Sequence, residues 1–394
     1  MFVLKLLYSY FFLSTLYVLI LSIAGCFRRK VDLHSVQSNK FNKIAVLVPA
    51  YKEDVVMISS VENILRSDYP KSSFDIIVIA DSLAPNTLKL LRKFPVQVVE
   101  VSFSASTKVK SLSEAMRVIE DKYDIAIISD ADNHLATNFL SKINNAFISG
   151  HTVVQGRRVA KNLDTATAIM DAYSEVVNNH IYRKGANNLG LSSALIGSGM
   201  AFRYSDLKET LKKVKAVGGF DKVLQLSLIE QGHEITYLEE AIIYDEKVSN
   251  TSSFKNQRKR WYSSQYKYLR KYSFLGLRML LRGNFSYFNL AVLSGVFPSN
   301  IINLGSVFIL ALLFSFSAGS SKAILAWWIL FFTLLISLII PASNINFKKA
   351  LLRALFVTPK LFLLSVKAIL RIYNADQKFI HTQHIYQEAS IDSK

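Results

Sequence analysis

The sequence predicts an α/β domain with a mostly parallel central sheet, together with transmembrane and interfacial helices. Two observations predict this class. From residue 43 to residue 155, short apolar runs alternate with helical segments, which is typical of successive β–α–β units. Outside that region, apolar runs at 6–27, 300–316 and 323–340 are each close to the length needed to cross a bilayer. The 394 residues leave room for more than one domain.

The charge distribution indicates a membrane partner. The chain is 51% hydrophobic and has a net charge of +18, with a mean hydropathy of +0.25. No acidic residue lies between Glu246 and Asp376, a window with 17 Lys and Arg. Such a window suits nucleic acid or an anionic membrane surface, and only the membrane also accounts for the apolar runs. Cys26 is the single cysteine, which excludes an intrachain disulfide and a cysteine-based metal site.

The apolar and charged segments divide the chain into six parts. In order, we expect a membrane anchor at 1–30, a linker at 31–42, a cytoplasmic α/β domain at 43–253, amphipathic interfacial helices at 254–285, two transmembrane helices at 286–345, and a C-terminal interfacial helix with a cytoplasmic tail at 346–394. Basic residues follow the first and last apolar runs, so the positive-inside rule places the α/β domain in the cytoplasm. We therefore expect an integral membrane protein of a plasma membrane, such as a bacterial inner membrane.

Three carboxylates converge on one edge of the expected sheet. Asp130 and Asp132 directly follow the buried strand at 124–129, and Asp81 follows the strand at 74–80. Ligands of open α/β sheets bind beyond the carboxyl ends of the strands, and two hard oxygen ligands one residue apart suit a divalent cation that bridges to a diphosphate. For the Asp-x-Asp pattern alone, a solvated turn is the alternative. The first strand, which we expect to stop at Pro49, leads into a turn without glycine, so a Rossmann fingerprint and a P-loop are both excluded.

Two further stretches are candidates for contacts with other molecules. Small residues at 197–199 permit close approach of a ligand to the backbone, although a tight loop is the simpler interpretation. After Trp261, cations recur at spacings of four and seven on one face of a helix, while Tyr and Leu lie on another. This pattern is typical of a helix in a membrane interface. An ordinary surface helix is the alternative.

Taken together, these motifs resemble the membrane-bound family-2 glycosyltransferases, the group of cellulose, chitin and hyaluronan synthases and lipid-linked glycosyltransferases. The resemblance covers roughly 43–261. Its motifs are the opening strand and turn Val46–Glu53, the Asp-x-Asp at 130–132, and Gln257–Trp261, which matches Q-x-x-R-W. It implies a GT-A-like fold, a nucleotide-sugar donor, expected to be a UDP-sugar, and Mg²⁺ or Mn²⁺ as cofactor.

The resemblance also implies a role for each matching residue. The residues implied in donor binding are Pro49, Tyr51, Glu53, Asp81, Lys108, Asp130, Gln257, Arg258 and Arg260. Those implied in metal binding are Asp130 and Asp132. We expect the acceptor to lie against Gly197, Ser198, Gly199 and Trp261, with Gln155 shaping the same pocket.

Asp221 matches the catalytic base of the family, with one departure from the pattern. The family usually has a second acid directly before the base, and here that position is Phe220. Asp221 still precedes an apolar-patterned helix, as the base does in the family. The alternative role is a helix N-cap, which Asp favours, and Glu230 and Glu239 are the next candidates for the base.

The expected activity is inverting transfer of a sugar to a hydroxyl of a growing polysaccharide or glycan at the inner face of the membrane. Transfer of a single sugar to a lipid acceptor is the first alternative. A non-catalytic membrane subunit that keeps the fold is the second. Two C-terminal spans are few for a polymer-secreting channel, so a partner subunit or a homo-oligomer is also expected. No nucleic-acid partner is expected.

Overall fold

The computed structural model describes residues 2–27, 40–316 and 320–371, which divide into two compact units. Residues 40–161 and 194–246 form the α/β unit, and residues 2–27, 162–193 and 247–371 form the helical unit. The segment 162–193, which the sequence analysis assigned to the α/β domain, therefore belongs to the helical unit. Arg28–Lys30, most of the predicted linker, and the tail after 371 lie outside the described residues.

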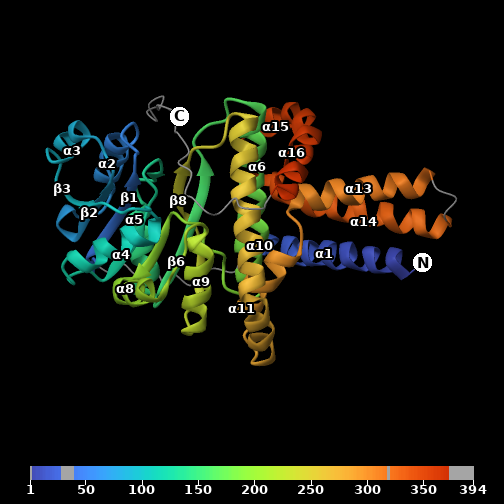
Figure 1. Cartoon of the computed structure of the whole chain (residues 1–394), viewed down its shortest axis with the longest axis horizontal. Helices are drawn as coiled ribbons and strands as arrows, with labels where there is room; N and C mark the ends of the chain where they lie inside the picture. The colour runs from blue at the N-terminus through green and yellow to red at the C-terminus, as the bar shows by residue number, and fades with distance from the viewer. Residues whose placement is uncertain (1, 28–39, 317–319, 372–394) are drawn as a thin grey trace. The chain divides into compact units, whose positions relative to one another are not determined.

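The α/β unit is built on one eight-stranded sheet (Figure 1). Its strands, in spatial order, are β3 (Val96–Val101), β2 (Phe74–Asp81), β1 (Ile44–Tyr51), β4 (Ile125–Ile128), β7 (Met200–Arg203), β6 (Val153–Ala160), β8 (Ile235–Asp245) and β5 (His134–Leu135). The first four strands in this order are parallel, as are β6 and β8, whereas β7 runs antiparallel to both of its neighbours. The predicted α/β class with a mostly parallel sheet is thus confirmed.

Helices pack on both faces of the sheet because each has one apolar side. They are α2 (Met57–Leu65), α3 (Pro85–Leu91), α4 (Lys108–Val118), α5 (Phe139–Ile148), α8 (Tyr204–Lys213) and α9 (Phe220–Glu230). The largest core cluster joins α2, α3 and α5 to the central strands, and its fully buried members include Met57, Leu91 and Phe139. On the other helices, Leu112, Leu207 and Leu224 are also fully buried. Strands covered on both faces explain the continuous apolar run of β4.

The end of β1 differs from the sequence prediction. The strand does not stop at Pro49 but continues to Tyr51, in parallel register with β2 from Ile44↔Phe74 to Tyr51↔Asp81. On its other side, β4 pairs only with residues 44–47 of β1. Pro49 therefore lies where one side of the strand has no ladder, and this is where a residue without an N–H is tolerated.

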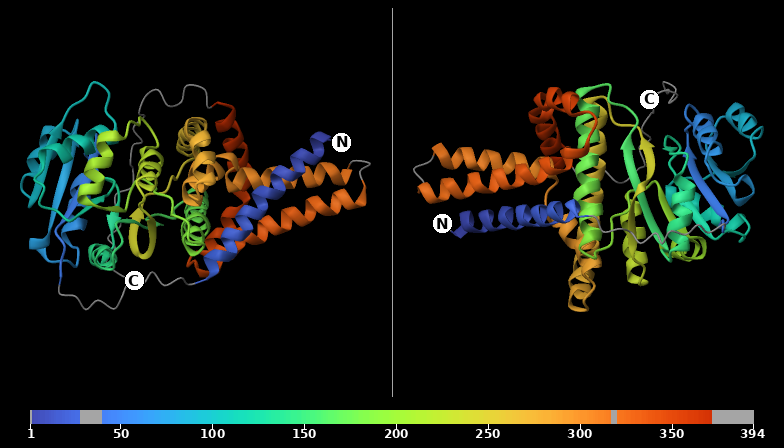
Figure 2. Two further views of the ribbon diagram at one scale, coloured as in Figure 1. Left: turned by 90° about the horizontal axis from the view of Figure 1, so that it is seen from below. Right: turned by 180° about the vertical axis from the view of Figure 1, so that it is seen from behind.

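The helical unit consists of long helices in two directions. Its elements are α1 (Phe2–Cys26), α6 (Ala166–Asn178), the π-helix Asn179–Gly185, α7 (Ala186–Asn188), α10 (Thr251–Leu281), α11 (Phe285–Phe288), the π-helix Asn289–Leu293, α12 (Ser294–Val296), α13 (Asn300–Phe316), α14 (Ser321–Ile339), the 3-10 turns Ile340–Asn344 and Leu355–Val357, α15 (Lys348–Ala354) and α16 (Thr358–Leu370). Helices α1, α13 and α14 run side by side, and α6 and α10 run across them (Figures 1 and 2). Pro359 lies in the first turn of α16, where a residue without an N–H costs no helical hydrogen bond.

Two helices of the helical unit are long and apolar enough to cross a membrane. They are Phe2–Cys26 and Ser321–Ser343. The predicted span at 300–316 is a helix, but it reaches spanning length only together with Phe285–Val296, from which it is bent by 50°. The described residues thus hold two candidate spans, or three when the bent pair is counted as one.

Candidate active site

Asp81 is placed to meet a ligand at the carboxyl end of β2. Its side chain is only 1% exposed, and its Oδ1 accepts a hydrogen bond of 3.0 Å from the Ser82 hydroxyl. Its Oδ2 is buried without a hydrogen-bond partner among the described residues. Lys52 and Ser82, which follow the adjacent ends of β1 and β2, have φ of 57° and 60°. Unsatisfied buried oxygens and left-handed non-glycine residues both cluster at functional sites, because a ligand compensates their cost.

Lys108, on helix α4, contacts the segment after β4 and the segment before β7. It lies in the first turn of α4, where the Thr107 side chain caps the helix by accepting from Lys110 N at 3.3 Å. Its ammonium forms an ion pair with Asp130 and donates to the Gly197 carbonyl at 2.7 Å. A cation beside a carboxylate and a glycine carbonyl, at the carboxyl ends of parallel strands, is suited to bind a diphosphate.

The loop at 194–199 is held from beneath by a buried glutamine. Gln155 is fully buried in β6, accepts from the Ile196 N–H at 3.0 Å, and donates to the Ser198 carbonyl at 3.0 Å. The Ser198 hydroxyl in turn accepts from the Asp130 N–H at 2.9 Å. Gly199 has φ of +62°, and a Cβ there would lie 2.9 Å from Cγ2 of Ile243, so glycine is required. Backbone and side chain at 197–199 thus fix the start of the Asp-x-Asp turn.

The turn carries two carboxylates one residue apart, Asp130 and Asp132. Asp132 accepts at its backbone carbonyl from Lys161 Nζ at 2.5 Å. The described residues contain no group of three or more His, Cys, Asp or Glu side chains arranged to hold a metal. Asp130 and Asp132 would therefore supply two oxygen ligands, and phosphates and waters the others, which is how Mg²⁺ is usually bound beside nucleotides.

Asp221 lies in the first turn of α9 but does not cap it. The N-cap is Gly219, which has φ of 60°, so the alternative role of Asp221 as an N-cap residue is excluded. Withdrawal from water raises the pKa of the Asp221 carboxyl, and the charges of Lys222 and Lys108 oppose that rise. A carboxyl with a raised pKa beside two cations is suited to accept a proton.

Phe220, the residue before Asp221, packs against the Lys108 ammonium. Its ring is 7% exposed, and Lys108 Nζ lies 5.0 Å from the ring centroid. The position that holds a second acid in the resembling family therefore contributes a cation–π contact here. The other candidate bases are less well placed, because Glu230 is exposed and Glu239 is exposed and lies 3.8 Å from Arg157.

The predicted site residues are divided between the two units. Those gathered at the carboxyl edge of the α/β unit are Pro49, Tyr51, Glu53, Asp81, Lys108, Asp130, Asp132, Gly197, Ser198, Gly199 and Asp221. The Q-x-x-R-W residues belong to the helical unit, on α10. There Arg258 Nη2 lies 2.6 Å from Oδ1 of Asp171, and Gln257 Oε1 is buried without a partner among the described residues. Neither Asp171 nor Lys161 was predicted from the sequence. For Asp171 the available signal was a pair of acids four residues apart in the apolar helix α6, Asp171 and Glu175.

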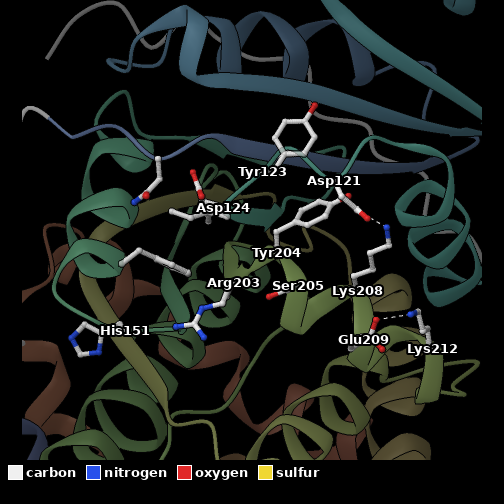
Figure 3. Close-up of a pocket in the computed structure, with 13 residues that line it drawn as sticks. Asp121, Tyr123, Asp124, His151, Arg203, Tyr204, Ser205, Lys208, Glu209 and Lys212 are labelled. Atoms are coloured by element: carbon white, nitrogen blue, oxygen red, sulfur yellow. Dashed lines mark hydrogen bonds and ion pairs between the residues drawn. The ribbon is translucent and has the colours of Figure 1, made fainter.

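A cavity of about 750 Å³ lies beside the start of β4 (Figure 3). Its lining includes Asp124 and Ile125, which begin the strand, together with Lys208 and Glu209 of α8. Opposite charges pair within it, as in the ion pair of Lys208 with Asp121 (Figure 3). None of the predicted site residues lines this cavity.

The order of the strands and the reversed β7 define a GT-A-like α/β fold. Residues 42–264 match the model of glycosyltransferase-like family 2, so the chain belongs to this family. Among curated proteins, the probable glycosyltransferase YdaM of Bacillus subtilis (strain 168) is 26% identical over 112 residues. That alignment covers 27% of each protein, so the chain matches about a quarter of the length of this relative.

Solved structures agree on the fold. The mannosyltransferase PcManGT from Pyrobaculum calidifontis, in complex with GDP-Man and Mn²⁺, has a TM-score of 0.54 at 16% identity, over 94% of this chain and 98% of that one. TarS 1–349 of S. aureus, in complex with UDP-GlcNAc, has a TM-score of 0.42 at 14% identity, over 85% and 90%. At these identities the similarity concerns the fold alone. It rests on the mannosyltransferase, with its TM-score of 0.54.

Proposed function

We propose that the chain is an integral membrane glycosyltransferase that moves a sugar, with inversion, from a nucleoside-diphosphate donor to an acceptor hydroxyl. The observation that carries the proposal is the cluster around Lys108. This cation pairs with Asp130, donates to Gly197, and acts electrostatically on Asp221. A diphosphate site and a candidate base therefore share one cation, in a chain of glycosyltransferase family 2.

The reaction would be a single displacement. The acceptor oxygen forms a bond to the anomeric carbon while the bond from that carbon to the diphosphate oxygen breaks. Asp221 takes the proton of the acceptor hydroxyl, and the nucleoside diphosphate leaves with the bonding electrons. Lys108 would stabilise the charge that develops on the leaving diphosphate. When bound at Asp130 and Asp132, Mg²⁺ or Mn²⁺ would add positive charge at the same place.

The donor is proposed from the site and from the structural neighbours. The buried free oxygen of Asp81 suits an N–H or O–H donor such as a nucleobase or a ribose. The mannosyltransferase with a similar fold was solved with GDP-Man and Mn²⁺. UDP-sugars, expected from the sequence, and GDP-sugars are therefore the two donor classes to test first.

The helices of the helical unit support the proposal that the protein lies at the cytoplasmic face of a membrane. Helices α1 and α14 meet the criteria for spans. Helix α10 runs across them (Figure 1) and exposes Phe274 and Leu281, at 81% and 89%, beside a row of cations. We propose that α10 lies in the interface and that the α/β unit is cytoplasmic, because basic residues follow the last span.

Transfer of a single sugar to a lipid acceptor is favoured by one observation over extension of a polysaccharide. The helices α1, α13 and α14 share a core filled by side chains, including Phe11, Val18, Trp327 and Leu334. A bundle packed in this way offers no path for a polymer through one copy of the described helices. Polymer extension would then require an oligomer or a partner subunit.

The test uses the purified full chain in lipid nanodiscs with a panel of UDP- and GDP-sugars, read by release of the nucleoside diphosphate. Turnover with at least one donor, lost on metal chelation and restored by Mn²⁺ or Mg²⁺, is expected. Asp221→Asn should abolish transfer while donor binding remains, and Glu114→Gln, at a half-buried acid of α4, is the matched control. The base assignment is wrong if Asp221→Asn keeps the parent rate. Products in the lipid extract or in the aqueous phase separate the two acceptor classes.

A further inference from the structure

Trp261 is stacked on an arginine that is itself stacked on a second aromatic ring. The Arg258 guanidinium carbon lies 4.3 Å from the centroid of the Trp261 ring and 4.7 Å from that of Phe254. The three residues are spaced four and three apart and share one face of α10. Trp261 is 40% exposed, so one part of its ring meets the guanidinium and another part is open.

Arg258 is fixed at its far end by an acid of another helix. Its Nη2 lies 2.6 Å from Asp171 Oδ1, and the side chains are 11% and 7% exposed. Asp171 lies in the middle of α6. A charge-assisted hydrogen bond between two nearly buried groups holds both in one geometry, since breaking it would leave a charge unpaired. This guanidinium is therefore held by an internal contact, and the diphosphate contact expected for it from the sequence stays a prediction.

The next acid of α6 holds the segment that leads into α10. Glu175, one turn after Asp171, lies 3.4 Å from Lys247 Nζ and 2.8 Å from Arg183 Nη1. Lys247 precedes α10 by four residues. The two acids thus tie both the approach to α10 and its second turn to the same face of α6, and Asp171 is the one that reaches the aromatic stack.

We propose that Asp171 is a positioning residue for the acceptor. It holds Arg258 behind Trp261, so that the ring presents a fixed flat face to the acceptor sugar or headgroup. This inference rests on the proposed function and on the expectation from the sequence that the acceptor lies against Trp261. Loss of Asp171 would leave the donor site in the α/β unit intact and would free the guanidinium and the ring together.

A fluorescence experiment tests the clamp without any assay of transfer. The chain has three Trp and 18 Tyr, so Trp327→Phe with Trp328→Phe leaves Trp261 as the only tryptophan, which is excited selectively at the red edge of the tyrosine absorption. In this background Asp171→Asn should raise acrylamide quenching of Trp261 and lower its anisotropy. Arg258→Lys, which keeps a cation for Asp171 but removes the planar stack, should do the same. Asp171→Asn leaves the buried Arg258 cation unpaired. A second test is therefore the double variant Asp171→Leu with Arg258→Met, which removes both charges and leaves no unpaired charge behind. Unchanged quenching in all three variants would refute the clamp.

The kinetic test separates positioning from a structural role. Asp171→Asn should raise KM for the acceptor by about tenfold, the usual consequence of losing one hydrogen bond to a charged group, and leave KM for the donor unchanged. A merely structural role would lower the yield of folded protein and leave both KM values as they are. If no donor supports transfer, the proposed function fails, and the quenching result still decides whether Asp171 fixes Trp261.

Discussion

Replacing Gln155 with leucine should loosen the loop that starts the Asp-x-Asp turn. The change removes the acceptor of the Ile196 N–H and the donor to the Ser198 carbonyl, both at 3.0 Å in a fully buried place. A buried polar group that loses its partner costs about 1–3 kcal/mol, so the two groups together make local opening easier by roughly 2–6 kcal/mol. The Ser198 hydroxyl that accepts from Asp130 N–H moves with the loop, and transfer should slow although Gln155 touches no substrate.

Hydrogen exchange of the segment 194–200 measures this effect directly. A loss of about 2 kcal/mol corresponds to roughly 30-fold faster exchange of protected amides. Gln97→Leu, at an exposed position of β3, is the control and should change nothing in this segment. Parent-like exchange at 194–200 in the leucine variant would refute the support that we assign to Gln155.

Three other changes have expected outcomes. Lys222→Gln removes a charge that lowers the pKa of Asp221; the acid limb of kcat/KM, which follows that pKa in the free enzyme, should move to higher pH, and a shift to lower pH would contradict the assignment. Gly199→Ala places a Cβ 2.9 Å from Ile243 at φ of +62°, so thermal unfolding should show a destabilisation of about 2–4 kcal/mol, the sum of left-handed strain and overpacking. Asp81→Asn removes a buried charge with a free oxygen: Tm should hold or rise while calorimetry shows about tenfold weaker nucleotide binding, and equal affinity would argue against a ligand at Asp81.

The parallel half of the sheet could be predicted from the sequence because its strands are covered on both faces. Buried strands are continuous apolar runs, as in β4, and each such run ends at a polar residue that becomes part of the site. The reversed strand β7 was missed, since Met200–Arg203 is short and follows a glycine loop that reads as a turn. Its place depends on pairing with β4 and β6, which are distant in sequence. The hydrogen bonds of the Gln155 and Asp171 side chains could not be predicted from the sequence either, because their partners are determined by tertiary packing.

Phe220 shows how a departure from a family pattern can be compatible with the chemistry. A second acid at this position would raise the pKa of Asp221 further by like-charge repulsion, and it would compete with Asp130 for Lys108. With a ring in its place, Lys108 keeps Asp130 as its ion-pair partner and packs 5.0 Å from the aromatic centroid. The charges that oppose the raised pKa of Asp221 are then those of Lys222 and Lys108. Phe220→Glu should therefore move the acid limb of kcat/KM to higher pH, whereas Phe220→Leu, which changes no charge, should leave it in place.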